Sequence, residues 1–284
     1  MNIRGELKHN FLKQIIYRVD YKGLLDSDVE KCVKELQNLL YKSGLTSLDT
    51  RTENRMDFEL KTNLQIPNET PLSVTNSSTN MVFVFKSENE KKMLEISKTF
   101  LTLTVITDSS YTSFDEYLKL LVTTIEKLRS SSVYFKALRI GLRKINLCFI
   151  ENLDDIQHYF KPSAINILDT LSSIKNFECK ASNAVTILEK DAFRINYLRD
   201  LQEGITVSEE QTPRNIYQVV IDVDVFSDDI KIISQMIRDK EKTEETLKRQ
   251  NSLAFDCYIN SLTDEFIDKL KQNTFDDSKI KEVI

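Results

Sequence analysis

The chain is poor in the residues from which many catalytic sites are built. Only two of its 284 residues are histidines, His9 and His158, so a histidine-based dyad or triad would need two distant segments to meet. Its five glycines are isolated from one another, which leaves no phosphate-cradling loop and no dinucleotide-binding fingerprint. We therefore predict no catalytic residue, and we set aside ATPase, GTPase and dinucleotide-dependent activities.

Cysteine is also sparse. The four cysteines are scattered, with no CxxC pair and no histidine at metal-ligand spacing, so we expect reduced, buried thiols. Asp222 and Asp224 form an Asp-x-Asp pair, but two carboxylates on one strand without a third ligand are too few to hold a cation. We predict neither a metal nor a cofactor.

Long apolar runs are missing as well. No stretch of about 18 apolar residues is present to span a bilayer, and residues 1–8 contain no apolar segment followed by a cleavage site. These absences predict a cytoplasmic protein without a membrane partner. The net charge of −5 argues against coating nucleic acid through bulk electrostatics, although it allows a local basic patch.

Alternating and helical spacings of apolar residues predict an α+β fold, mainly an antiparallel sheet packed by helices, with a helical C-terminal tail. The expected N-terminal half, residues 1–160, has strands at 10–21, 56–64, 81–86, 91–97 and 100–107, helices at 29–40 and 113–129, and an arginine-bearing strand at 133–150. The expected C-terminal half, residues 161–284, has a helix at 164–174, strands at 177–189, 192–200 and 216–226, and a helical tail at 229–272. Because both halves run from strands to helix, a distant duplication is a further hypothesis.

Two segments are expected to lie outside this regular framework. Residues 67–80 begin with prolines and continue with a polar run, which predicts a flexible loop, and a second loop is expected at 204–214. Residues 238–250 carry charges of both signs, which indicates either a solvated helix with i,i+4 ion pairs or a protruding arm that binds a partner or a second copy.

The arginine-bearing strand contains the one glycine that sits inside a strongly apolar run. Arg139, Gly141 and Arg143 share one face of it, with the two arginines about 13 Å apart along the strand. The gap at Gly141 would admit a flat ligand, a phosphate-rich ligand or a bulky side chain. Because the apolar residues change parity after Leu142, we predict a β-bulge or kink between Leu142 and Ile145.

A second strand offers matching acids. In residues 216–226 the apolar side chains alternate inward, which places Asp222 and Asp224 on the opposite face. If the two strands are neighbours, the aspartates are the natural partners of Arg139 and Arg143. One interpretation is a structural charge network, and the other is an anion site in which the arginines bind phosphate or carboxylate.

The motif carried by Arg139, Gly141, Leu142, Arg143 and Asn146 resembles that of a sporadically distributed, functionally uncharacterised family of bacterial and archaeal proteins. That family has an Arg-x-Gly-Leu-Arg-Tyr-x-Asn strand and a late Leu/Ile-Asp-x-Asp strand that leads to a helical tail. The resemblance covers about residues 10–272. Lys144 stands where the family usually has an aromatic residue, so no stacking role carries over to that position.

The resemblance implies no established activity. Its patchy distribution is similar to that of genes on mobile elements, including phage-defence and toxin–antitoxin loci. We therefore expect a non-enzymatic binding or regulatory component that recognises another protein, the product of a neighbouring gene, through residues 238–250 and 67–80. A homodimer is left open. The alternative function is a nucleotide- or nucleic-acid-binding protein, including a nuclease, that uses Arg139 and Arg143.

Overall fold

A computed structural model describes residues 3–8, 10–60, 72–108, 111–165, 179–207 and 213–275. The N-terminal part of the chain consists of α1 (Ile3–Glu6), β1 (Leu12–Lys22), α2 (Asp26–Lys42), β2 (Ser47–Leu60), β3 (Leu72–Lys86), β4 (Lys92–Ser97), β5 (Phe100–Ile106), α3 (Asp115–Ser131) and β6 (Lys136–Ile150). The C-terminal part consists of η1 (Leu153–Asp155), α4 (Ile156–Tyr159), β7 (Ala181–Lys190), β8 (Phe193–Val207), β9 (Pro213–Ser227), α6 (Ile230–Met236), α7 (Lys240–Asn260) and α8 (Asp264–Gln272).

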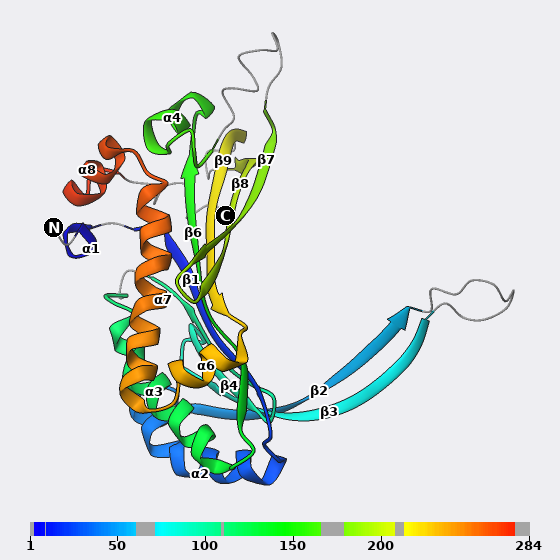
Figure 1. Ribbon diagram of the computed structural model, residues 1–284. Helices are drawn as coiled ribbons and strands as arrows, with labels where there is room; N and C mark the ends of the chain where they lie inside the picture. The colour runs from blue at the N-terminus through cyan, green and yellow to red at the C-terminus, as the bar shows by residue number, and fades with distance from the viewer. Residues whose placement is uncertain are drawn as a thin grey trace, which may run out of the picture.

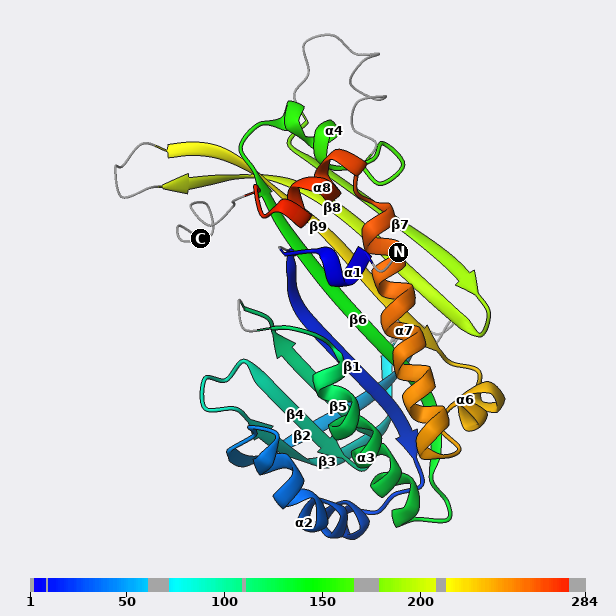
Figure 2. The ribbon, with the colours of Figure 1, turned by 90° about the vertical axis from the view of Figure 1, so that its left-hand side faces the viewer.

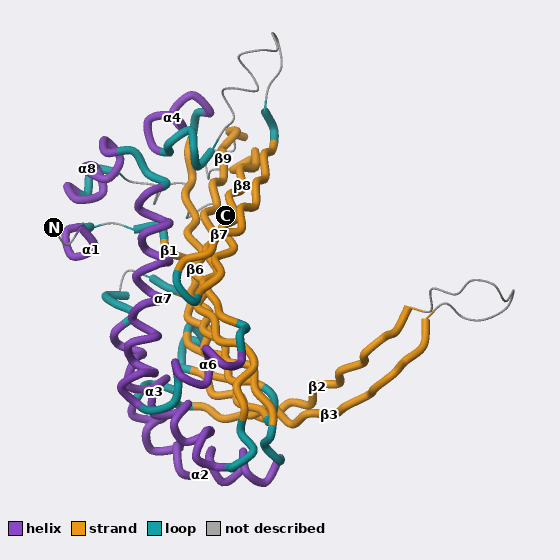
Figure 3. Tube along the Cα trace, viewed as in Figure 1, coloured by secondary structure: helices purple, strands orange, loops and turns teal. Residues whose placement is uncertain are grey.

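All of these strands belong to one antiparallel sheet of nine strands, in the order β2-β3-β4-β5-β1-β6-β9-β8-β7. Helices α2, α3 and α7 lie against one side of the sheet, and no helix of the described residues lies on the other side (Figure 1, Figure 3). We call these the helix face and the open face. The predicted α+β fold with a helical C-terminal tail is confirmed.

The chain builds the sheet from two segments of similar order, one from β1 to α3 and one that starts at β6, before the expected boundary at residue 160 (Figure 2). Each begins with a central strand, β1 or β6, and its last strand, β5 or β9, returns to pair with that first strand before helices follow. β1 and β6 are themselves antiparallel neighbours. The order fits a duplication, which stays a prediction, as does the division into domains at residue 160.

The core lies between the sheet and its helices in two large clusters. The first is built from β1, β4, β5 and β6 with α2 and α3, and includes Ile15, Tyr17 and Leu121. The second is built from β6, β8 and β9 with α7 and α8, and includes Val223 and Phe266. β6 and α7 supply residues to both clusters.

The predicted loops are partly wrong. Residues 72–80 belong to β3, where each pairs with β2 except Thr75, which falls at a register shift, and residues 67–71 lie outside the described part. Ladder hydrogen bonds and β-branched threonines outweigh the local polarity of this run. Gly204–Val207 likewise continues β8, and β9 already begins at Pro213. The predicted helix at 164–174 falls almost entirely outside the described residues.

The charged segment at 238–250 does not protrude. It forms the first half of α7, which packs along the sheet with Thr243, Thr246, Leu247 and Gln250 buried. Its exposed side has the expected ion pairs, such as Lys248–Glu244. The hypothesis of a protruding arm is therefore wrong. The sequence did not show the buried side of this helix, because that side carries small and neutral polar residues instead of an apolar stripe.

What does project from the body is the hairpin of β2 and β3. β3 pairs with β4 only over Val82–Lys86, whereas its ladder with β2 continues to the Leu60–Leu72 pair. Residues 53–60 and 72–80, here called the outer hairpin, therefore pair with no further strand among the described residues. They extend away from the helices, on the side of the open face (Figure 1).

No helix within the described ranges combines the length and apolar character needed to cross a membrane.

Candidate functional site

β6 places the residues singled out by the sequence on two different faces of the sheet. Arg139, Gly141 and Arg143 lie on the open face. Asn146 lies on the helix face, where it is buried and donates from Nδ2 to the carbonyl of Ile221 at 3.1 Å. Five of the six predicted site residues are thus brought together on the open face, and Asn146 is separated from them by the sheet.

The predicted bulge between Leu142 and Ile145 is wrong. β6 pairs with β9 in unbroken register from Ile140 to Ile150. Against β1 the register shifts elsewhere, once opposite Leu138 and once at Lys13 of β1. The apparent change of parity arises because Lys144 and Asn146 occupy the buried helix face while Ile145 turns to the open face.

The space left by Gly141 is filled by the neighbouring arginine. A Cβ on Gly141 would lie 2.9 Å from Nη1 of Arg139, so the guanidinium lies over the glycine. There Arg139 stacks on Phe226, with Cζ 4.6 Å from the ring centroid, and donates from Nη2 to Asp224 at 2.8 Å. Burial raises the pKa of Asp224, and the charge of Arg139 opposes that rise. No gap for a flat ligand is left at this position.

Arg143 forms an ion pair with the other aspartate, Asp222. Its Nε donates to both carboxylate oxygens of Asp222 at 2.9 and 3.0 Å, and its Nη2 donates to Oδ2. The Asp222 side chain is only 8% exposed, whereas the Arg143 side chain is 47% exposed. These hydrogen bonds raise the pKa of Arg143. Both ion pairs run diagonally from β6 to β9. Arg143 stands directly opposite Asp224 in the strand register, but its ion pair is with Asp222.

The same arrangement of paired arginines continues along the open face. Arg18 pairs with Asp20 at 2.8 Å and lies over the Phe100 ring, and Arg51 of β2 pairs with Glu95 of β4 at 2.7 Å. The first pair lies within β1 and the second spans β3, and both leave the arginine partly exposed. The ion pairs of Arg139 and Arg143 agree with a structural charge network, and the anion site stays a prediction.

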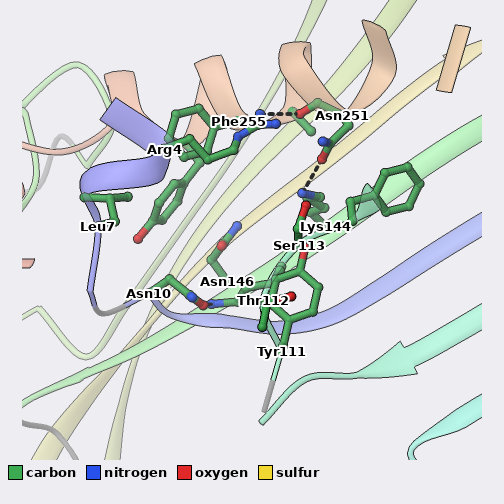
Figure 4. A pocket seen from close by; sticks show the side chains of 14 residues that line it. Arg4, Leu7, Asn10, Tyr111, Thr112, Ser113, Lys144, Asn146, Asn251 and Phe255 are labelled. Atoms are coloured by element: carbon green, nitrogen blue, oxygen red, sulfur yellow. Dashed lines mark hydrogen bonds between the residues drawn. The ribbon is translucent and has the colours of Figure 1, made fainter. Parts of the chain in front are cut away.

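A pocket lies on the helix face, and of the predicted site residues only Asn146 belongs to it. It is a cavity of about 120 Å³ between α1, β6, α7 and the segment before α3, lined by Arg4, Leu7, Asn10, Leu12, Tyr111, Thr112, Ser113, Phe114, Lys144, Asn146, Asn251, Ala254, Phe255 and Tyr258. We call it the Lys144 pocket. Figure 4 shows Lys144 and Arg4 both directed at Asn251.

Lys144 is the least expected member of this pocket. Its side chain is buried, and Nζ donates to Oδ1 of Asn251 at 2.6 Å. The Phe114 ring lies 5.8 Å from the same nitrogen. Burial lowers the pKa of Lys144 to about 7, and the nearby charge of Arg4 acts in the same direction. The signal in the sequence was Lys144 itself, a charged residue at an inward parity position of the strand.

The remaining candidates stay apart from both sites. His158 is exposed, with Nδ1 3.9 Å from Glu265, and His9 lies outside the described residues. Cys32 and Cys148 are buried as expected, whereas Cys179 and Cys257 are half-buried, and all four are free thiols. Across the described ranges, no three His, Cys, Asp or Glu side chains come together as a metal-ion site.

Neither a scan against models of protein families nor a search of curated proteins found a match for this chain. The family resemblance therefore remains a prediction based on the motifs of β6 and β9.

Proposed function

We propose that the protein is a non-enzymatic binding component that recognises another protein through its open face and outer hairpin. The observation that carries this proposal is the outer hairpin, which extends from the body on the side of the open face and pairs with no third strand in the described part of the chain. A lone two-stranded hairpin is marginally stable in water. Contact with a partner would supply the packing that the rest of the sheet does not provide.

The chemistry of the open face supports a protein as the partner. Arginines stacked on aromatic rings, as in Arg139 on Phe226 and Arg18 on Phe100, are typical of protein–protein interfaces. Val82, Val84 and Phe100 form a small apolar cluster on this face, but each is at most 6% exposed. The groups that the open face offers to a partner are therefore the partly exposed arginines rather than this cluster.

The alternative, binding of nucleotide or nucleic acid through Arg139 and Arg143, has less support. Each of these arginines already donates to an aspartate, so their charges are compensated. A phosphate would have to displace a carboxylate from each guanidinium, and one of these carboxylates, that of Asp222, is almost buried. Non-specific phosphate binding depends on uncompensated positive charge.

The identity of the partner rests on the resemblance alone. A product of a neighbouring gene in a phage-defence or toxin–antitoxin locus, and a location in the cytoplasm, remain predictions.

The homodimer alternative has one feature in its favour. β7 is an edge strand with Val185 and Ile187 exposed, and such edges can pair with a second chain.

The test is co-expression of the tagged chain with the product of each flanking gene, comparing the full chain with a hairpin-shortened chain. In the latter, Asn-Gly replaces residues 56–77, so that the Arg55–Ser78 pair closes a two-residue turn. We expect one product to bind the full chain and to bind the shortened chain at least about tenfold more weakly.

The matched control alters the other predicted contact surface. The double variant Glu244→Gln with Lys248→Gln removes an exposed ion pair of α7 and should bind the partner as the full chain does. Unchanged binding by the shortened chain, loss of binding in the α7 variant, or the absence of any complex with the flanking gene products would each refute the proposal.

A further inference from the structure

We propose that the Lys144 pocket binds a small organic carboxylate, held by Lys144 and Arg4. The pocket opens on the helix face, whereas the proposed partner surface is the open face, so this inference does not depend on partner binding. It concerns a ligand site that is separate from the charge network on the open face and that contains only Asn146 of the predicted site residues.

The first argument is the charge of the lining. Both charged side chains that line the pocket, Lys144 of β6 and Arg4 of α1, are cationic, and no aspartate or glutamate is among the lining residues. The other polar groups are the amides of Asn10, Asn146 and Asn251 and several hydroxyls. A cavity with this lining favours an anion.

The second argument is the incomplete hydrogen bonding of Lys144. An ammonium group has three donors, and within the described part of the chain its acceptor is the neutral Oδ1 of Asn251, at 2.6 Å. The residue is only 9% exposed, and a buried charge is costly without a counter-charge. A bound carboxylate would provide both the counter-charge and further acceptor atoms.

The third argument is the way in which one residue holds both cations (Figure 4). Asn251 accepts from Lys144 with its side-chain oxygen and from Nη2 of Arg4 with its backbone carbonyl, at 3.0 Å. Arg4 also stacks on Phe255, with Cζ 4.4 Å from the ring centroid. The two cations, which repel each other, are thereby fixed on one side of the cavity.

The apolar lining decides the class of anion. Leu7, Leu12, Phe114, Ala254 and Phe255 face the same cavity, and they would pack against a hydrocarbon body rather than against a bare inorganic ion. A cavity of about 120 Å³ suits a short chain. A compact carboxylate with an apolar end fits both parts of the lining, whereas phosphate would leave the apolar part without contact.

Binding should be coupled to protonation of Lys144. Burial places the pKa of this residue at about 7, and a carboxylate beside it would favour the charged form. The titratable groups around it are Arg4 from α1, Tyr111 and Asp115 beside the start of α3, and Tyr258 from α7. Because burial holds the pKa of Lys144 near neutrality, we expect proton uptake when the ligand binds above pH 7.

The experiment is isothermal titration of the full chain with sodium isovalerate, with the neutral isostere isovaleramide and with inorganic phosphate. We expect isovalerate to bind at least about tenfold more tightly than either control ligand. Repeating the isovalerate titration at pH 8 in two buffers of different ionisation enthalpy should show net proton uptake.

Three variants complete the test. Lys144→Met and Arg4→Met should each weaken isovalerate binding at least about tenfold, and Lys144→Met should also abolish proton uptake. Lys31→Met, at an exposed position of α2, should bind as the unaltered chain does. Should Lys144→Met not fold, Arg4→Met on the short helix α1 decides. The proposal is overturned if isovalerate does not bind, if isovaleramide or phosphate binds equally well, or if the folded pocket variants bind with unchanged affinity.

Discussion

At the scale of single residues, Lys144 has an environment that is unusual for a lysine. It is a lysine at a buried strand position, with a pKa lowered to about 7 by burial. In the unfolded chain the pKa of a lysine is about 10.4. Between these two values the unfolded chain holds a proton that the folded chain has lost, so the free energy of unfolding increases with pH in this window.

The first prediction compares the unaltered chain with Lys144→Met. From pH 7 to pH 9 the unaltered chain should gain about 2 kcal/mol of unfolding free energy relative to the variant. Denaturant titrations of both chains at several pH values measure this difference, in which the contributions of other titrating groups cancel. A difference that stays constant from pH 7 to pH 9 would contradict the electrostatic account of Lys144.

The second prediction concerns the asymmetry of the Arg143–Asp222 pair. Arg143→Met leaves a nearly buried carboxylate without its counter-charge and should cost about 3 kcal/mol of unfolding free energy. Asp222→Asn leaves a half-exposed guanidinium, which water can solvate, and should cost only about 1 kcal/mol. Equal or reversed costs, measured by chemical denaturation, would show that exposure does not govern this pair.

At the scale of elements, the junction between β1 and α2 depends on Gly23. Its φ of +92° is unfavourable for residues with a side chain, and an added Cβ would lie only 1.9 Å from the carbonyl oxygen of Tyr134. Gly44 follows α2 with a φ of +83°, but its surroundings are open to 4 Å. Replacing Gly44 therefore tests backbone strain alone, whereas replacing Gly23 tests backbone strain together with a steric collision.

The third prediction uses this pair. Gly44→Ala should cost about 1 kcal/mol, the strain of a left-handed residue. Gly23→Ala should cost several times more, because the connection before β6 has to move as well. Unfolding free energies of the two variants provide the measurement, and comparable losses would rule out the collision at Tyr134.

Elements with simple burial patterns could be predicted from the sequence, and those with buried polar residues could not. β1 and α3 each bury one apolar face, so their spacing identified them correctly. In β6, Lys144 and Asn146 lie on the buried face. Because these inward positions are polar, the apolar residues of the sequence seemed to change faces, and a bulge was wrongly predicted. In α7 the buried face carries Thr243, Thr246 and Gln250, so the sequence shows no apolar stripe by which to recognise it. Both errors have the same cause, a polar side chain that finds its hydrogen bond inside the fold.

The candidate sites divide in the same way. The pairing of the arginines with Asp222 and Asp224 was expected, because alternation along two strands fixes which side chains share a face. The Lys144 pocket was not expected, because it forms where α1, β6 and α7 meet and depends on contacts between residues far apart in the chain, such as Lys144 with Asn251. The strand character of residues 72–80 was missed for a similar reason, since their partners lie across the hairpin in β2.

At the scale of the whole molecule, the two core clusters share β6 and α7. Ile140 belongs to the first cluster and Ile150 to the second, and the same holds for Leu247 and Leu253 of α7. Neither cluster can lose its packing without exposing surface of the other. The two halves of the chain should therefore unfold together.

The fourth prediction is a single unfolding transition. The chain has no tryptophan, so Tyr117→Trp in α3 and Tyr197→Trp in β8 give separate fluorescent reporters of the two clusters. For each variant, the denaturation curve measured by fluorescence should have the same midpoint as the curve measured by circular dichroism. A reporter whose midpoint departs from the circular dichroism curve of the same variant would indicate two independent domains.

The central claim, recognition of a protein through the open face, is tested most directly by site-specific photo-crosslinking. A photoreactive residue is placed at Thr104 of β5, on the open face, or at the exposed Lys31 of α2, on the opposite side, and the chain is irradiated with its partner present. We predict a crosslinked adduct from position 104 and none from position 31. An adduct from position 31 with none from position 104 would contradict the account.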